Sequence, residues 1–369
     1  MFDRRLFRNF DFLLLLIVCA IMFVSLLVIS SATLENGSGD PFFYAKRQAT
    51  WIILGLLVLL ATLSIDYTQI YRLAPYLYVL NLLLLIAVLF FGREAGGAQR
   101  WLDLKIFDFQ PAEFSKIILI VSLARLLASR EGNFDSFFST VPALIHVLVP
   151  TALILRQPDL DTSIVIIVIV FSMLFMAGAK MRHLLLYIVL GAASSVLFYF
   201  YGMQHYQKMR FVVFLNPGKY PLGYGYQLMQ SLIAIGSGGV GGKGLFVEGT
   251  QSRLAFLPAQ HTDFIFSVLA EETGFLGAAA LLVLFALMVF RILRTAASAK
   301  DTFGALVCTG VAGMFTFQIL VNIGMATGVM PVAGLTLPFM SYGGSSLVSN
   351  LIAVGLVLNV GMRRHKLTF

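Results

Sequence analysis

Three carboxylates stand out in an amino-acid sequence that is otherwise mostly apolar. Asp263 lies at the mouth of one apolar segment, and Glu271 and Glu272 lie within that segment. Acidic groups near a bilayer are costly unless they face protein or water, so by default they mark a functional site. For Asp263 the structural alternative is helix N-capping, because it precedes a predicted helix.

Cations and helix N-termini elsewhere offer binding chemistry for an anionic ligand. Glu113 and Lys116 are three residues apart, so on a helix they share a face. They either neutralise each other, or Lys116 presents its cation to a ligand while Glu113 orients it. The serine-rich segment 341–346, with Gly343 at its centre, is either a tight turn or a phosphate site at a helix N-terminus.

Other polar positions favour structural roles. Asp159 and Asp161 precede an apolar segment beside Thr162, where N-capping accounts for them. No second histidine lies at ligand spacing from His261, which indicates a hydrogen-bonding loop residue rather than a metal ligand. The glycine-rich loop 236–244 contains the pattern G-x-G-x-x-G of dinucleotide-binding sites. No strand precedes it, and a chain of helical spans leaves no βαβ unit, so we expect no nucleotide site there.

The composition places these residues in a membrane. Hydrophobic residues make up 59% of the chain, charged residues make up 12%, and the mean hydropathy is +0.89. These values indicate a polytopic membrane protein rather than a soluble domain. The net charge of +8 comes without basic runs that interleave with aromatics, so no nucleic-acid partner is expected. Cys19 and Cys308 fall inside apolar segments, where a disulfide framework is not expected.

The apolar runs predict an all-α polytopic membrane protein with about ten transmembrane helices in a single integral membrane domain, residues 1–369. The predicted spans are 11–31, 49–65, 74–92, 112–129, 138–155, 162–179, 184–202, 264–290, 304–326 and 346–361. The first is too long for a signal peptide and lacks an obvious cleavage site, so we expect it to be retained. An even number of spans places both termini on one side.

The distribution of Lys and Arg predicts that this side is cytoplasmic. The short loops on the side of the termini hold most of these residues, including Arg4, Arg5 and Arg8. The long loop at about 203–262, between the seventh and eighth spans, is then extracytoplasmic. The polar, glycine- and proline-rich sequence therefore gathers on the outer side, where chemistry cannot rely on ATP.

Several of these segments carry the motifs of one known family. The chain resembles the SEDS family of bacterial cell-wall polymerases (shape, elongation, division and sporulation), which includes the RodA and FtsW branches. The matching runs are Gln110-Pro111-Ala112-Glu113 with Lys116, Gln157-Pro158-Asp159-Leu160, the loop 236–244, His261-Thr262-Asp263-Phe264, Glu271-Glu272-Thr273-Gly274-Phe275, Asn322, and Leu337-Pro338-Phe339 through Ser346. They lie in the family's order over nearly the whole chain. The run 328–335 is more similar to the RodA branch than to FtsW.

Three positions depart from the family pattern. Ala112 and Ala259 replace residues that are commonly Ser and Glu, and Asp161 stands where Gly is usual. The missing acid at position 259 leaves open which carboxylates besides Asp263 shape the site.

The resemblance implies a peptidoglycan glycosyltransferase. Such an enzyme polymerises lipid II, the undecaprenyl-pyrophosphate-linked disaccharide-pentapeptide, at the outer face of the bacterial cytoplasmic (inner) membrane during cell elongation. The leaving group is already part of the donor, so no ATP is needed. The donor's α linkage becomes β, which suits direct displacement with one general base. Asp263 is the base that we expect to take the proton of the acceptor 4-hydroxyl.

The departing undecaprenyl pyrophosphate needs positive charge or backbone donors as its own charge develops. The expected cations are Arg47, Arg100, Lys116, Arg210 and Lys243, of which the two arginines Arg100 and Arg210 can act bidentately. The other residues expected to bind substrate are Glu113, Asp159, Thr262, Ser341, Gly343 and Ser345. The chemistry demands no cofactor, although a divalent cation, Mg²⁺ or Mn²⁺, would help to screen the pyrophosphate, with Asp159, Asp263 and Glu113 as conceivable ligands.

Two rival functions fit the same membrane topology. A flippase for lipid-linked precursors would need polar, gated paths to both faces, and the cytoplasmic side lacks them. A non-catalytic scaffold would leave the Asp263 segment without a purpose. The resemblance also implies protein partners: a class B penicillin-binding transpeptidase, whose single span packs against this chain, and other elongation-complex proteins among the membrane lipids.

Overall fold

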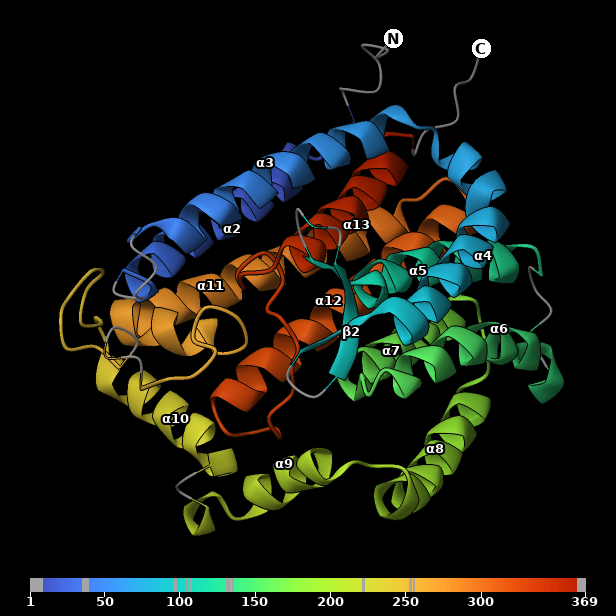
Figure 1. The fold of residues 1–369 in the computed structure, drawn as a ribbon. Helices are drawn as coiled ribbons and strands as arrows, with labels where there is room; N and C mark the ends of the chain where they lie inside the picture. The colour runs from blue at the N-terminus through green and yellow to red at the C-terminus, as the bar shows by residue number, and fades with distance from the viewer. Residues whose placement is uncertain are drawn as a thin grey trace.

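The computed structural model describes residues 9–34, 40–95, 98–103, 105, 108–130, 134, 136–220, 223–251, 254 and 256–363. Within these residues the chain forms twelve α-helices and one small sheet (Figure 1). The N-terminal arginines Arg4, Arg5 and Arg8, which helped to predict the orientation, lie outside the described residues.

Each of the ten predicted spans corresponds to one helix. These helices are α2 (Phe12–Ala32), α3 (Phe43–Ser64), α4 (Tyr67–Phe91), α5 (Pro111–Ala128), α6 (Phe137–Arg156), α7 (Leu160–Met176), α8 (Met181–Tyr201), α11 (Ile265–Ala297), α12 (Thr302–Ala326) and α13 (Gly344–Met362). Within the described chain, eight are long and apolar enough to cross a membrane. The other two are α5, which carries Glu113, Lys116 and Arg125, and α7, which has only 17 residues. The predicted class, an α-helical multi-pass membrane protein, is confirmed.

The connections contain structure that the hydropathy pattern does not predict. An antiparallel sheet in the order β1 (Arg93–Ala95), β2 (Ala98–Asp103) and β3 (Asp108–Phe109) lies between α4 and α5. The long connection predicted as a loop at 203–262 contains α9 (His205–Leu215), two short 3₁₀ turns (Pro217–Lys219 and Gly223–Gly225) and α10 (Tyr226–Gly238). These pieces are too short to give a span-length apolar signal.

The helices differ widely in how much of their surface is covered by protein. α12 and α13 are the most buried: α12 packs against α5, α7 and α11, and α13 packs along α3. In contrast, α8 has only His183 and Leu184 buried and packs mainly against α7, so it stands apart from the bundle in Figure 1. Its exposed surface is apolar, as expected for a helix that faces lipid.

Carboxylates fix where several helices begin. Asp11, Asp66, Asp159 and Asp301 are the N-cap residues of α2, α4, α7 and α12, and each accepts a hydrogen bond from a backbone N–H of the first turn. Such a cap satisfies one of the amide donors that a helix leaves unpaired at its start. The N-cap role predicted for Asp159 is confirmed.

The glycine-rich loop 236–244 covers a break in α11. Gly274 interrupts this helix with φ 67° and ψ −164°, a conformation that is essentially restricted to glycine. Four backbone hydrogen bonds join the loop to the break: Lys243 N–H to Glu271 O (3.0 Å), Gly244 N–H to Glu272 O (2.9 Å), Phe275 N–H to Gly239 O (2.9 Å) and Leu276 N–H to Val240 O (3.2 Å). The loop therefore satisfies backbone groups that the broken helix leaves without intrahelical partners.

Substituting Gly274 with Ala should destabilise the protein by about 2 kcal/mol or more. A Cβ atom there would lie 2.3 Å from the Gly242 nitrogen and 2.5 Å from the Val240 oxygen. Gly236→Ala is the matched control, because a Cβ at this position in α10 meets nothing within 4 Å. We expect thermal unfolding in detergent to show a lower Tm only for Gly274→Ala; equal Tm values would contradict the interlocked loop.

Candidate active site

The turn that carries Asp263 is held through its backbone. Ser341 Oγ donates to Thr262 O at 2.6 Å, and the N–H of Tyr342 donates to His261 O at 2.8 Å. Asn322 Nδ2, on α12, donates to Asp263 O at 2.9 Å and to Leu335 O at 2.7 Å. The connection between α12 and α13 thus fixes the main chain of the turn while it leaves the Asp263 carboxylate uncommitted.

The side chain of Asp263 does not cap a helix. The N-cap of α11 is Phe264, and no side chain accepts a capping hydrogen bond there, so the capping alternative for Asp263 is wrong. The residue is half-buried. Among the residues that the structure describes, its carboxylate has no hydrogen-bond or ion-pair partner. A ligand can therefore take that place.

The surroundings of Asp263 make it a better base than an ordinary aspartate. Burial raises the pKa of its carboxyl to about 6; Arg210 and Arg100 oppose this rise, and the negative charge of Asp161 adds to it. A carboxylate with a pKa near the working pH is ionised enough to accept a proton and basic enough to hold it in a transition state.

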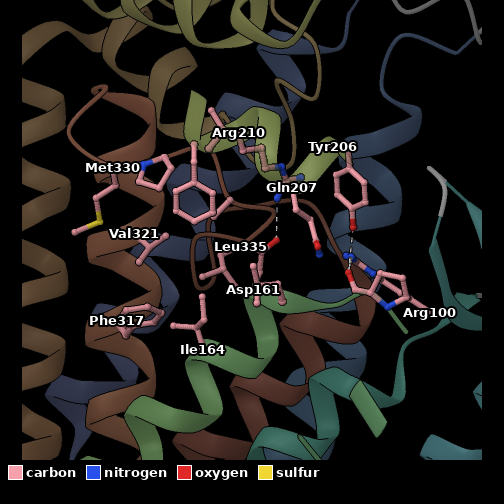
Figure 2. Close-up of a pocket in the computed structure, with 16 residues that line it drawn as sticks. Arg100, Asp161, Ile164, Tyr206, Gln207, Arg210, Phe317, Val321, Met330 and Leu335 are labelled. Carbon is pink, nitrogen blue, oxygen red and sulfur yellow. Dashed lines mark hydrogen bonds and ion pairs between the residues drawn. The ribbon is translucent and has the colours of Figure 1, made fainter. Parts of the chain in front are cut away.

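The two arginines and Asp161 line one end of a cavity of about 240 Å³ (Figure 2). Arg100 comes from β2, Asp161 from the first turn of α7, and Arg210 from α9. The rest of the wall is mostly apolar and includes Ile164, Phe317, Val321, Met330 and Leu335. A cavity with a charged end and an apolar body suits an amphipathic molecule with an anionic head.

Each arginine of the cavity has a carboxylate partner. Arg100 Nη1 lies 3.8 Å from Asp159 Oδ1, and Arg100 also donates to the carbonyls of Gln157 and Pro158. Arg210 Nη1 donates to Asp161 Oδ2 at 3.2 Å. The two pairs hold both guanidinium groups at the charged end of the cavity, and neither group is fully buried.

Comparison with known proteins shows the family to which the chain belongs. The family model for FtsW, RodA and SpoVE, described as "Cell cycle protein", matches residues 8–366. This chain belongs to the SEDS family. It is 41% identical over 360 residues to the peptidoglycan glycosyltransferase MrdB of Escherichia coli, covering 98% of this chain and 95% of that one. It is 37% identical over 359 residues to the stage V sporulation protein E of Bacillus subtilis, with coverage of 95% and 96%.

Solved structures agree with the SEDS assignment. A chain from a structure on the coordination of polymerization and crosslinking by a peptidoglycan synthase complex superposes with a TM-score of 0.81 at 35% identity, covering 97% of this chain and 99% of that one. The rod-shape-determining protein RodA of Thermus thermophilus superposes with a TM-score of 0.72 at 34% identity, with coverage of 97% and 98%. The predicted likeness to RodA is confirmed.

Of the site residues predicted from the sequence, the structure brings together Arg100, Asp159, Arg210 and Asp263. Others lie elsewhere. Lys116 is fully buried and donates to Glu113 Oε2 at 2.9 Å, in line with the self-neutralising pair. Lys243 lies 2.6 Å from Glu271 Oε1 and helps to tie the glycine loop to α11. Neither lysine lines the described cavity.

The serine-rich segment of this SEDS protein is used largely for internal contacts. Ser341 Oγ accepts from the N–H of Leu337 in addition to its bond to Thr262 O. Ser345 Oγ donates to Asp108 O and accepts from Gln110 N–H, each at 3.2 Å. Gly343 is the N-cap of α13, and Arg47 is exposed on α3. Their contacts with substrate remain predictions.

Two further residues shape the SEDS site. Asn322 was visible only as a motif residue, and its role in holding both Asp263 and Leu335 needs the fold. Asp161 was predicted as part of a helix start and as a departure from the family pattern. The structure places Asp161 in the first turn of α7 and shows in addition that its side chain accepts a hydrogen bond from Arg210 (Figure 2).

The predicted metal ligands do not gather into one group. Among the described residues, no three His, Cys, Asp or Glu side chains lie close enough together to hold a metal ion. The described residues therefore do not build a metal site of their own.

Proposed function

We propose that this SEDS protein, a peptidoglycan glycosyltransferase, polymerises lipid II into glycan strands at the outer face of the bacterial cytoplasmic membrane during cell elongation. The observation that carries the proposal is the carboxylate of Asp263, which has no partner among the described residues and lies within electrostatic reach of two cavity arginines. The Escherichia coli relative, named as a peptidoglycan glycosyltransferase, supports the same activity.

In the proposed reaction Asp263 acts as the general base. Its carboxylate takes the proton of the acceptor 4-hydroxyl while that oxygen attacks the anomeric carbon of the donor. The bond from that carbon to the pyrophosphate oxygen breaks, and undecaprenyl pyrophosphate leaves with the electron pair. Arg100 and Arg210 at the charged end of the cavity stabilise the developing negative charge. Direct displacement converts the α linkage into β.

A second cavity supports a path for the lipid tail. This cavity, of about 340 Å³, is lined by residues of α7, α11 and α12, including Val168, Phe175, Leu293 and Leu320. Phe317 lines both this cavity and the charged one, so the two follow each other along the α7–α12 seam. Phe175, Leu293 and Leu320 of this cavity are exposed, so a lipid can reach it from the bilayer.

The proposed protein partner is a class B penicillin-binding transpeptidase that crosslinks the new glycan. The structural match to a chain of a peptidoglycan synthase complex, over 97% of this chain, supports such an assembly. The complex would couple polymerisation by this protein to crosslinking by its partner.

Reconstitution separates polymerisation from the alternative, a lipid-linked precursor flippase. We expect the purified protein with its transpeptidase partner to convert lipid II into long glycan in proteoliposomes, measured by gel electrophoresis of labelled product. Lipid II translocation is followed in the same vesicles, with protein-free vesicles as the control. Movement of lipid II across the bilayer without any polymer would overturn the proposal and favour the flippase.

A further inference from the structure

One carboxylate oxygen joins three separate segments at the mouth of the charged cavity. Asp161 Oδ2, in the first turn of α7, accepts from Arg210 Nη1 of α9 at 3.2 Å and from the N–H of Gly334 at 2.9 Å. Gly334 lies in the connection between α12 and α13. The side chain of Asp161 is only 12% exposed, and Figure 2 shows it pointing toward Arg210.

The residues on both sides suit this junction. A Cβ atom at position 334 would lie 3.2 Å from Asp161 Oδ2, so glycine there lets the backbone N–H approach the carboxylate. On the other side, Arg210 lies over the ring of Tyr206, with 5.7 Å between the guanidinium carbon and the ring centroid. The Tyr206 hydroxyl in turn donates to Pro158 O at 3.2 Å. Arg210 is thus held from two directions.

The rest of α9 gives Arg210 little support. This helix packs mainly against the two 3₁₀ turns that follow it, and the preceding helix α8 packs mainly against α7. The position of Arg210 relative to the bundle therefore depends on side-chain contacts. Among the described residues, these are its ion pair with Asp161 and its contact with the ring of Tyr206. An arginine has five N–H donors, and one bond to Asp161 leaves the others for an anion.

We propose that Asp161 is a positioning residue that holds Arg210 at the subsite for the pyrophosphate of the lipid-linked donor. The proposal rests on the proposed function, because that function supplies the anionic ligand. A preset arginine binds the pyrophosphate without first having to be ordered, so loss of Asp161 should weaken donor affinity. Because Arg210 also stabilises the charge that develops on the leaving group, the chemical step should slow as well. The same carboxylate fixes the wall of the cavity through Gly334.

Steady-state polymerisation of lipid II separates this role from simple fold stabilisation. We expect Asp161→Ala to raise KM about tenfold, the scale of one charge-assisted hydrogen bond, and to lower kcat in addition. Asp161→Asn keeps an oxygen that can accept from both Arg210 and Gly334, so its KM should stay within about threefold of the wild-type value. A purely structural role would instead lower the amount of active enzyme, and so kcat, at constant KM.

A binding measurement tests the proposal without turnover. We expect the Kd for undecaprenyl pyrophosphate in detergent to rise about tenfold in Asp161→Ala and in Arg210→Ala, with little further rise in the double variant, because both changes remove one interaction. An unchanged Kd in Asp161→Ala overturns the proposal. If the wild type binds this lipid but polymerises nothing, the proposed function fails while the role of Asp161 is still tested.

The distance between α9 and the α12–α13 connection can be measured with spin labels. The labels are attached through Leu215→Cys and Val329→Cys, at positions that are 74% and 70% exposed. Cys19→Ser removes the exposed cysteine, and Cys308 is buried. We expect a narrow distance distribution in the wild type and in Asp161→Asn, and a broad one in Asp161→Ala. A narrow distribution in all three would show that Asp161 does not hold α9, which overturns the proposal.

Discussion

Asp263→Asn should reduce kcat/KM for lipid II polymerisation by about a hundredfold or more, the scale of a missing general base. Asn keeps the size of the side chain but cannot take the acceptor proton. Asp108→Asn is the matched control, because that aspartate is about half exposed and lies 3.8 Å from its arginine partner. Its activity should stay within about twofold of the wild type.

The pH dependence of the same reaction provides a second measurement. Because the pKa of Asp263 is raised to about 6, mainly by burial, kcat/KM should fall as the pH drops below 6. In the unfolded chain the carboxyl returns to an ordinary pKa near 3.8, so the raised folded value favours the protonated form. The stability from this group is present below pH 3.8 and is lost as the pH rises through 6.

Activity and stability should therefore respond to Asp263→Asn in opposite directions. At pH 7.5 the variant escapes the cost of a half-buried charge, so its free energy of unfolding should rise by on the order of 2 kcal/mol while its activity is lost. Loss of a helix cap would lower the stability instead. If Asp263→Asn polymerises lipid II normally, the base lies elsewhere.

Lys116→Met should lower the free energy of unfolding by about 3 to 5 kcal/mol, because it leaves the Glu113 carboxylate buried without its ammonium partner. The double variant Lys116→Met with Glu113→Gln removes both charges and should recover most of that loss. Thermal unfolding in detergent measures all three proteins.

An exposed ion pair gives the matched control for this experiment. Lys46 lies 2.7 Å from Asp40, and the two side chains are 68% and 40% exposed, so Lys46→Met should change stability by less than about 1 kcal/mol. If Lys116→Met unfolds like the wild type but binds lipid II poorly, then Lys116 is the anion ligand that the sequence left open.

The spans could be predicted because each is a long apolar run, and a membrane helix must satisfy its backbone within itself. The small sheet, α9 and α10 could not, since short segments are stabilised by contacts made only in the folded chain. The hydrogen bonds of the glycine loop to the break at Gly274 are one example. They link residues about 30 positions apart, and no local pattern predicts them.

The candidate site, like the fold, could be predicted only in part. The sequence indicated which charged residues lie on the outer side, but not which of them meet. Arg100 and Arg210 reach the cavity, whereas Lys243 and Lys116 lie beside nearer carboxylates. The role of Asp161 was missed because its partners, Arg210 and the N–H of Gly334, come from segments distant in sequence.

The side-chain amide of Asn322 links two backbone segments of the site. A single side chain holds the backbone of Asp263 and the backbone of Leu335 in the cavity wall, so the proposed base and the cavity share one support. We therefore expect any movement that admits or releases a long lipid to involve α8, in which only His183 and Leu184 are buried. We expect the turn that carries Asp263 to stay in place while α8 moves as the lipid enters or leaves.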